Sequence, residues 1–227
     1  DNNNSKNSKN SKNNSKTSEK KKKRKVNLGT ALSPNIDLLL QYSRPSSFGR
    51  GEELIYDENI RKGKEINSEL LNIEIDDYYF KKIQTKVKKE LFPYSNDISF
   101  VFKKLAIYEP GGHFQTHRDT ARSHNHQGTL LIEVRSDHTG GDLVLEHNNH
   151  TFHWSLQNST QDDDEKLFCR SHNSYTLQYI AFFTDVNHRV EPITSGLRMT
   201  LQYDIFVESD QKEEDKEDKE EKDKEKE

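Results

Sequence analysis

Three side chains of this sequence could bind one metal ion together. His117 and Asp119 are two residues apart, and His188 follows 69 residues after Asp119. Residues two apart in a β-strand project to the same face, so a histidine on another strand could complete their ligand set. Two histidines and one carboxylate occupy one face of an iron(II) ion and leave the other coordination positions open. The spacing therefore predicts an iron site that can bind a co-substrate and oxygen.

Arg198 lies ten residues after His188 and indicates what else this site could bind. A guanidinium holds a carboxylate through two parallel hydrogen bonds. Arg198 and Thr200 share one face of a predicted strand at 197–206, whose other face is apolar. That polar face suits a cavity for an anion, but a polar face exposed to solvent is common in antiparallel sheets and, on this strand alone, is the favoured interpretation. The apolar positions are Leu197, Met199, Leu201, Tyr203 and Ile205.

The elements that would position these residues follow from the hydrophobic pattern. Apolar residues spaced by threes and fours predict a helix over 74–91, which Pro93 ends. A short apolar stretch at 36–42 and a short strand at 53–56 precede it. Turn signals separate the later predicted strands, at 98–108, 114–119, 129–134, 142–147, 151–154, 175–183 and 197–206. This pattern predicts a mainly β sandwich or barrel (α+β) with a supporting helix.

Both ends of the chain differ in composition from its middle. Residues 1–26 form a basic Asn/Ser/Lys-rich arm with ten basic and two acidic residues, and 208–227 form a Glu/Asp/Lys tail with twelve acids and six lysines. Neither segment has apolar residues to bury, so both are expected to be disordered. The domain is expected at 27–207, with its catalytic core at about 100–207. Its net charge of −6 argues against specific binding of nucleic acid.

Composition also suggests a compartment. Cys169 is the only cysteine, which excludes an intrachain disulfide. No apolar run approaches the roughly 20 residues of a membrane span, and no signal peptide is visible. A cytoplasmic or nuclear location without membrane association is expected. The basic cluster at 20–25 resembles a nuclear localisation signal, although a solvated lysine run would look the same.

Eight further histidines lie in the window from His113 to His188, and they are assigned a surface or hydrogen-bonded role. These are His113, His124, His126, His138, His147, His150, His153 and His172. Trp154, Phe182 and Phe183 are expected in the core. The tripeptide at 117–119 also occurs in protein kinases, but the glycine-rich loop, the Asp-Phe-Gly motif and the asparagine of kinases are missing, so that interpretation fails.

The order of motifs resembles the iron(II)- and 2-oxoglutarate-dependent dioxygenases, in particular the prolyl 4-hydroxylase-like branch. The matching residues, over about 100–207, are Tyr108, His117, Arg118, Asp119, Gly140, Gly141, His188, Gly196, Leu197 and Arg198. The resemblance implies a double-stranded β-helix (jelly roll) with N-terminal supporting helices. It also implies that His117, Asp119 and His188 bind Fe(II), and that Arg198 and Tyr108 bind 2-oxoglutarate. Thr200 and Thr129 are further candidates for that pocket, and ascorbate is a further candidate cofactor.

By this resemblance the chain would hydroxylate a C–H bond, with release of succinate and CO2. A protein or peptide is the expected substrate, with proline as the default side chain. Two alternatives stay open: an oxygenase of the same chemistry acting on a small molecule or modified nucleobase, and a catalytically silent jelly-roll binding module. All four key positions are filled, which favours the enzyme. The oligomeric state stays open.

Overall fold

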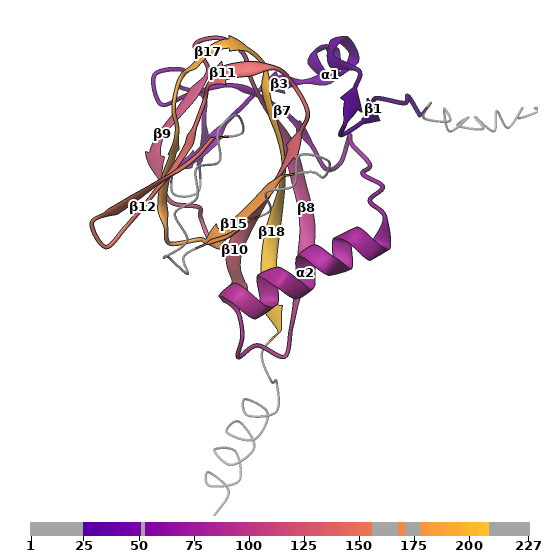
Figure 1. The fold of residues 1–227 in the computed structure, drawn as a ribbon. Helices are drawn as coiled ribbons and strands as arrows, with labels where there is room; N and C mark the ends of the chain where they lie inside the picture. The colour runs from indigo at the N-terminus through magenta and orange to yellow at the C-terminus, as the bar shows by residue number, and fades with distance from the viewer. Residues whose placement is uncertain (1–24, 51–52, 156–167, 171–177, 209–227) are drawn as a thin grey trace, which may run out of the picture.

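The computed structural model describes residues 25–50, 53–155, 168–170 and 178–208. Two antiparallel sheets face each other (Figure 1). The larger sheet contains, in spatial order, β14 (Phe168–Arg170), β15 (Tyr179–Phe183), β10 (His126–Val134), β18 (Arg198–Glu208), β8 (Asp97–Tyr108), β7 (Lys64–Asn67) and β3 (Arg44–Pro45). The smaller sheet contains β13 (His150–Trp154), β12 (Leu143–His147), β16 (Asn187–Val190), β9 (His113–His117) and β6 (Arg61–Lys62).

Three two-stranded pairs accompany these sheets: β1 (Gly29–Thr30) with β2 (Ser33–Pro34), β4 (Phe48–Arg50) with β5 (Glu53–Ile55), and β11 (His138–Gly140) with β17 (Ile193–Gly196). Eight of the strands form the double-stranded β-helix. In chain order these are β8, β9, β10, β12, β13, β15, β16 and β18. Of these, β8, β10, β15 and β18 lie in the larger sheet, and β9, β12, β13 and β16 lie in the smaller sheet. This connectivity confirms the predicted jelly roll.

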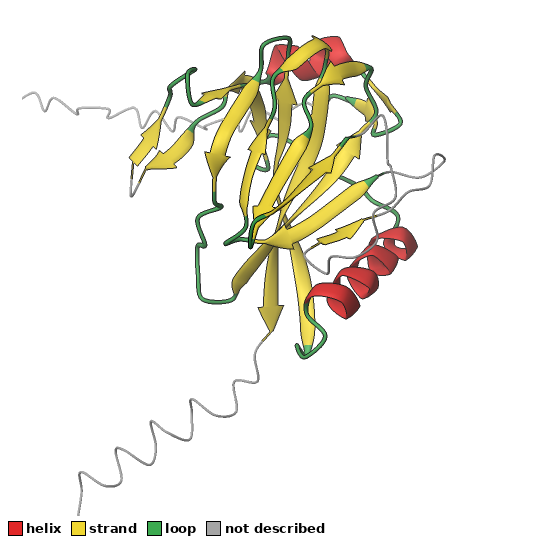
Figure 2. Cartoon of the chain, turned by 60° about the vertical axis from the view of Figure 1, so that its left-hand side comes forward, coloured by secondary structure: helices red, strands yellow, loops and turns green. Residues whose placement is uncertain are grey.

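A helix supports the outer face of the larger sheet (Figure 2). Helix α2 spans Asp77–Leu91, and the Asp76 carboxylate caps it by accepting hydrogen bonds from the backbone N–H groups of the first turn. The helix begins three residues later than predicted and ends before Pro93 as expected. Val87 and Leu91 pack with Met199 and Leu201 of β18 in one hydrophobic core. The apolar face of the last strand therefore faces the helix.

The polar face of β18 points into the space between the two sheets. Arg198, Thr200 and Asp204 are only 1%, 2% and 4% exposed. A second core fills the rest of this space and includes Tyr108, Trp154 and Phe182. A solvated polar face, one of the two interpretations of the sequence pattern, is therefore wrong. Polar side chains on an inner face indicate a cavity for a ligand, because burial without a partner is costly.

Several other predictions have a definite outcome. Residues 36–42 form helix α1 (Ile36–Tyr42), and the predicted strand at 53–56 is β5. His126 and His138 are buried and hydrogen-bonded, so for these two the hydrogen-bonded alternative holds and the surface alternative does not. Most of the basic arm, nearly all of the acidic tail, His172 and residues 175–177 lie outside the described part of the chain. No helix within the described ranges is both long and apolar enough to span a bilayer.

Candidate metal centre

The structure brings the three predicted ligands together at one point. The ligand atoms of His117, Asp119 and His188 all lie within 4.8 Å of one another. His188 of β16 pairs directly with His117 of β9, so the sheet register places the two rings side by side, with centroids 4.1 Å apart. Nε2 of His188 is 3.9 Å from Oδ1 of Asp119. The separation of 69 residues in the chain is thus closed by strand pairing.

Both histidines have their second ring nitrogen fixed by the backbone. Nδ1 of His117 is 2.8 Å from the carbonyl oxygen of Gln115, and Nδ1 of His188 is 3.0 Å from that of Val186. A carbonyl oxygen accepts, so each Nδ1 carries the proton and each Nε2 keeps a free lone pair. A metal-binding histidine is typically oriented in this way. The tautomers required for metal binding are therefore set by the fold.

Asp119 reaches the site from a loop and not from a strand. Strand β9 ends at His117, so the alternation of side chains along a strand does not explain the position of Asp119. The Thr129 hydroxyl of β10 donates a 2.5 Å hydrogen bond to Oδ2 of Asp119. Burial opposes ionisation of this carboxyl, but the neighbouring His188 and the Thr129 hydrogen bond outweigh burial and lower its pKa. Asp119 is therefore held as a carboxylate by the opposite sheet.

Aromatic rings pack around the two histidines. The Phe114 ring stacks on His117 with centroids 3.5 Å apart, and Phe182 lies 4.9 Å from the His188 ring. The guanidinium of Arg61 covers the Phe114 ring at 4.6 Å. Burial and the nearby His188 lower the pKa of His117 to about 3. Both effects keep this imidazole neutral at pH 7, as metal binding requires.

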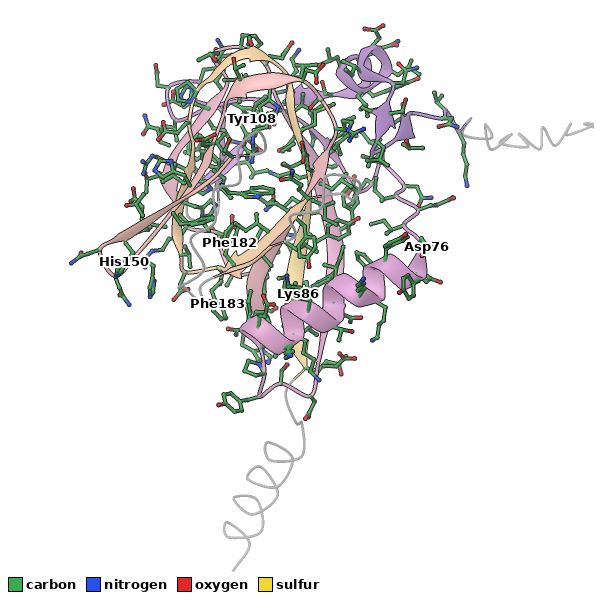
Figure 3. The ribbon with its side chains drawn as sticks, viewed as in Figure 1. Asp76, Lys86, Tyr108, His150, Phe182 and Phe183 are labelled. Carbon is green, nitrogen blue, oxygen red and sulfur yellow. The ribbon has the colours of Figure 1, made fainter. Side chains whose placement is uncertain are left out.

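A buried cation without a partner lies further along the same inner face. Arg198 is 1% exposed, and its Nε and Nη2 atoms have no hydrogen-bond partner among the described residues. Its guanidinium lies 5.9 Å from the Trp154 ring, and Arg198 pairs across strands with Tyr108, which also lies between the sheets (Figure 3). Burial lowers the pKa of Arg198. A cation buried in this way is costly unless an anion joins it.

The sheet register relates the position of the Trp154 ring to that of His188. His188 of β16 pairs with Leu145 of β12. Two residues further along the same face, Val190 of β16 pairs with Leu143 of β12, and Leu143 pairs in turn with Trp154 of β13. Successive positions on one face of a strand are about 7 Å apart. Trp154, whose ring lies near the guanidinium, is therefore one same-face position along the smaller sheet from the strand position paired with His188.

The remaining predicted pocket residues divide between two places. Tyr108 and Thr200 are buried beside Arg198 on the inner face. Thr129 was expected in the same pocket, but its hydroxyl contacts Asp119. Two inner-face residues were not predicted: Lys104, which bonds to Glu65 at 3.0 Å, and Glu133, opposite Thr200. A charged residue within an apolar strand was the signal that could have identified Glu133.

No protein-family model matches the chain, and no curated protein matches its sequence. The structure is similar to a 2OG-Fe(II) oxygenase family oxidoreductase from Burkholderia pseudomallei (12% identity, 76% of this chain and 77% of that chain, TM-score 0.48). It is also similar to a prolyl hydroxylase from Trichoplax adhaerens, solved with a hypoxia inducible factor peptide (15% identity, 75% of this chain and 74% of that chain, TM-score 0.48). A third similar structure is a Pseudomonas putida prolyl-4-hydroxylase (15% identity, 67% of this chain and 76% of that chain, TM-score 0.41). The first of these is a 2OG-Fe(II) oxygenase family protein, and the other two are prolyl hydroxylases.

Proposed function

We propose that this chain is an Fe(II)- and 2-oxoglutarate-dependent dioxygenase that hydroxylates a protein side chain. The observation that carries the proposal is the buried guanidinium of Arg198, whose Nε and Nη2 have no hydrogen-bond partner among the described residues, together with a cluster of two histidines and one carboxylate. A metal site alone does not define a reaction. A metal site accompanied by a buried cation suits a ligand that binds the metal at one end and carries a carboxylate at the other, and 2-oxoglutarate has that form.

In this proposal His117, Asp119 and His188 hold the metal through two Nε2 atoms and one carboxylate. The bound metal would supply oxygen activation coupled to decarboxylation of the keto acid. The chain supplies orientation and charge. Arg198 would bind the distal carboxylate of 2-oxoglutarate, and the buried Tyr108 hydroxyl lies on the adjoining strand to join it. The apolar residues around them exclude water from the cavity.

The proposed protein or peptide substrate, with proline as the default target, follows from the sequence resemblance. One surface feature agrees with a large substrate. Leu54 of β5 and the adjacent Tyr56 are 73% and 62% exposed. Phe48 of the paired strand β4 lies 6.4 Å from Phe114, which stacks on His117. Exposed apolar side chains next to a metal site are typical of a surface that binds a partner.

An anaerobic titration tests the co-substrate assignment. Addition of Fe(II) and then 2-oxoglutarate should give a visible metal-to-ligand charge-transfer band in the unmodified chain. Asp119→Ala should abolish the band, and Arg198→Ala should need far more 2-oxoglutarate to reach it. A chain that binds Fe(II) but gives no band at saturating 2-oxoglutarate would exclude the proposed dioxygenase.

A second experiment addresses the substrate. Peptide pools are incubated with Fe(II), 2-oxoglutarate and oxygen and then searched by mass spectrometry for the gain of one oxygen atom, with Asp119→Ala as the blank. Oxygen gain on proline in the active sample alone would support the default target. No oxygen gain on any peptide, with gain on small molecules or nucleobases incubated in parallel, would favour the alternative substrates.

A further inference from the structure

A second charged residue shares the inner face with Arg198. Glu133 of β10 pairs directly with Thr200 of β18, and Val134 pairs with Met199, so Glu133 is a diagonal neighbour of Arg198. Diagonal partners in an antiparallel pair have Cα atoms about 7–8 Å apart, within reach of long side chains. Thr129 and Leu131 occupy the same face of β10 at the metal end. Glu133 therefore lies on the inner face at the end of β10 away from the metal ligands, diagonally across from Arg198.

The Glu133 carboxyl is not neutralised by a direct contact. Among the described residues, it makes no hydrogen bond and no ion pair within 4 Å, although its backbone N–H donates to the carbonyl oxygen of Gln178. Burial raises the pKa of this carboxyl, and the positive charges of Arg198 and Arg135 only partly oppose the effect. In a structural ion pair, the carboxylate and the guanidinium would be in direct contact. Glu133 and Arg198 make no such contact among the described residues, which is the arrangement expected where a ligand binds between two side chains.

We propose that Glu133 is a second anchor for the distal carboxylate of the co-substrate: in its protonated form it donates a hydrogen bond to the carboxylate that Arg198 binds. This inference rests on the proposed function. It has a direct consequence, because two adjacent carboxylates in a buried site do not both stay ionised. When Glu133 is ionised in the empty pocket, binding of 2-oxoglutarate must take up one proton from solvent.

The charge count explains why the proton is needed. Arg198 contributes one positive charge, which the ligand carboxylate neutralises. An ionised Glu133 would leave the pocket with a net negative charge, and Asp142 adds a further carboxyl near Arg198. The other titratable groups near this end are Tyr108 on β8, His138 on β11 and Arg135, which follows the last residue of β10. Burial lowers the pKa of His138 and so favours its neutral form.

The proton uptake can be measured by titration calorimetry on the anaerobic Fe(II)-loaded chain. Binding of 2-oxoglutarate is recorded at one pH in two buffers with different ionisation enthalpies, and the series is repeated from pH 6 to pH 9. The unmodified chain should take up protons, and its affinity should fall by up to about tenfold per pH unit above the pKa of Glu133. Glu133→Gln keeps the shape and the hydrogen-bond donor, so it should bind without this uptake and with little dependence on pH.

Two controls isolate the role of Glu133. Glu90→Gln removes a surface carboxyl of helix α2 and should behave as the unmodified chain. Pyruvate offers the same keto acid to the metal but has no distal carboxylate, so its binding should not take up the proton assigned to Glu133. Protons exchanged by the metal ligands would appear with pyruvate as well and can be subtracted.

The outcomes separate this inference from the proposed function. No binding of 2-oxoglutarate by the unmodified Fe(II)-loaded chain overturns both. Binding without proton uptake at any pH, or with equal uptake in Glu133→Gln, overturns the role of Glu133 and leaves the dioxygenase proposal intact. If Glu133→Gln does not fold, as judged by circular dichroism, the pH series on the unmodified chain with 2-oxoglutarate and pyruvate decides alone.

Discussion

The Thr129 hydroxyl donates a 2.5 Å hydrogen bond to Oδ2 of Asp119 and so connects the metal-binding loop to the larger sheet. The other two candidate ligands are on the smaller sheet, where His117 pairs with His188. One ligand is therefore oriented by one sheet and two by the other. The geometry of the site depends on how the two sheets pack, and the first prediction tests this dependence.

Thr129→Ala should weaken metal binding by about 10–100-fold, the usual range for loss of a group that orients a ligand. The carboxylate of Asp119 would lose the hydrogen bond that lowers its pKa and fixes its direction. The measurement is the Fe(II) dissociation constant under anaerobic conditions. Thr129→Ser retains the hydroxyl and should bind nearly as the unmodified chain does. Equal affinity for Thr129→Ala and Thr129→Ser would show that this bond does not orient Asp119.

Arg198→Met should stabilise the ligand-free chain while removing the response to 2-oxoglutarate. The substitution replaces a buried guanidinium, two of whose nitrogens have no hydrogen-bond partner in the described part of the chain, by an apolar side chain, so the free energy of unfolding should rise by about 1–3 kcal/mol. Saturating 2-oxoglutarate should stabilise the Fe(II)-loaded unmodified chain, by about 2.7 kcal/mol at 100 times its dissociation constant. It should leave Arg198→Met unchanged. The measurement is denaturant unfolding with and without the ligand.

Arg189→Met is the matched control, because Arg189 bonds to both Glu146 and Glu191. It should give no gain in stability and keep the response to the ligand. A loss of stability in Arg198→Met would mean that the guanidinium already has a stabilising role in the ligand-free fold, and the anion pocket would lose its main support.

Gly141→Ala should weaken 2-oxoglutarate binding without changing metal affinity. Gly141 has a φ of +77°, and an added Cβ would overlap the Ile193 side chain and approach Cδ of Arg198 to 3.1 Å. The left-handed backbone alone costs roughly 1–2 kcal/mol for a residue with a side chain. Gly49→Ala is the control, since nothing lies within 4 Å of its added Cβ. Separate titrations of Fe(II) and 2-oxoglutarate are the measurement, and an unchanged co-substrate affinity would contradict the placement of Arg198.

The metal-free chain should lose stability as the pH falls from 6.5 towards 3. The pKa of His117 is about 3 in the folded chain, below its ordinary value of 6.5, so the unfolded chain binds more protons in this window. Stability therefore rises with pH there, by an amount on the order of a few kcal/mol. Unfolding of His117→Gln at several pH values should show a shallower slope. A slope equal to that of the unmodified chain would show that His117 is not buried in its neutral form.

The sequence alone was informative wherever the pattern was local or the residue type was rare. The strands at 98–108, 129–134 and 142–147 follow from alternation, and the helix ending at Leu91 follows from its period and from Pro93. Helix α1 was not predicted, because seven residues give too short a period to distinguish helix from strand. For His126 and His138 the sequence left a surface role and a hydrogen-bonded role open, because their polar neighbours in sequence do not show what packs on them.

The sequence by itself indicated a mainly β sandwich or barrel, its family resemblance implied the jelly roll, and its spacing indicated which residues could form the site: His117, Asp119, His188 and Arg198. Only the tertiary structure decided how these residues are held. Strand register places His188 beside His117, and a hydroxyl from the facing sheet orients Asp119. Burial between the sheets leaves Nε and Nη2 of Arg198 without a hydrogen-bond partner among the residues that the structure describes. The physical reason is that register, hydrogen bonding across a cavity and burial are properties of segments far apart in the chain. The spacing of residues along the sequence does not predict the strand register, the hydrogen bond to Asp119 or the burial of Arg198.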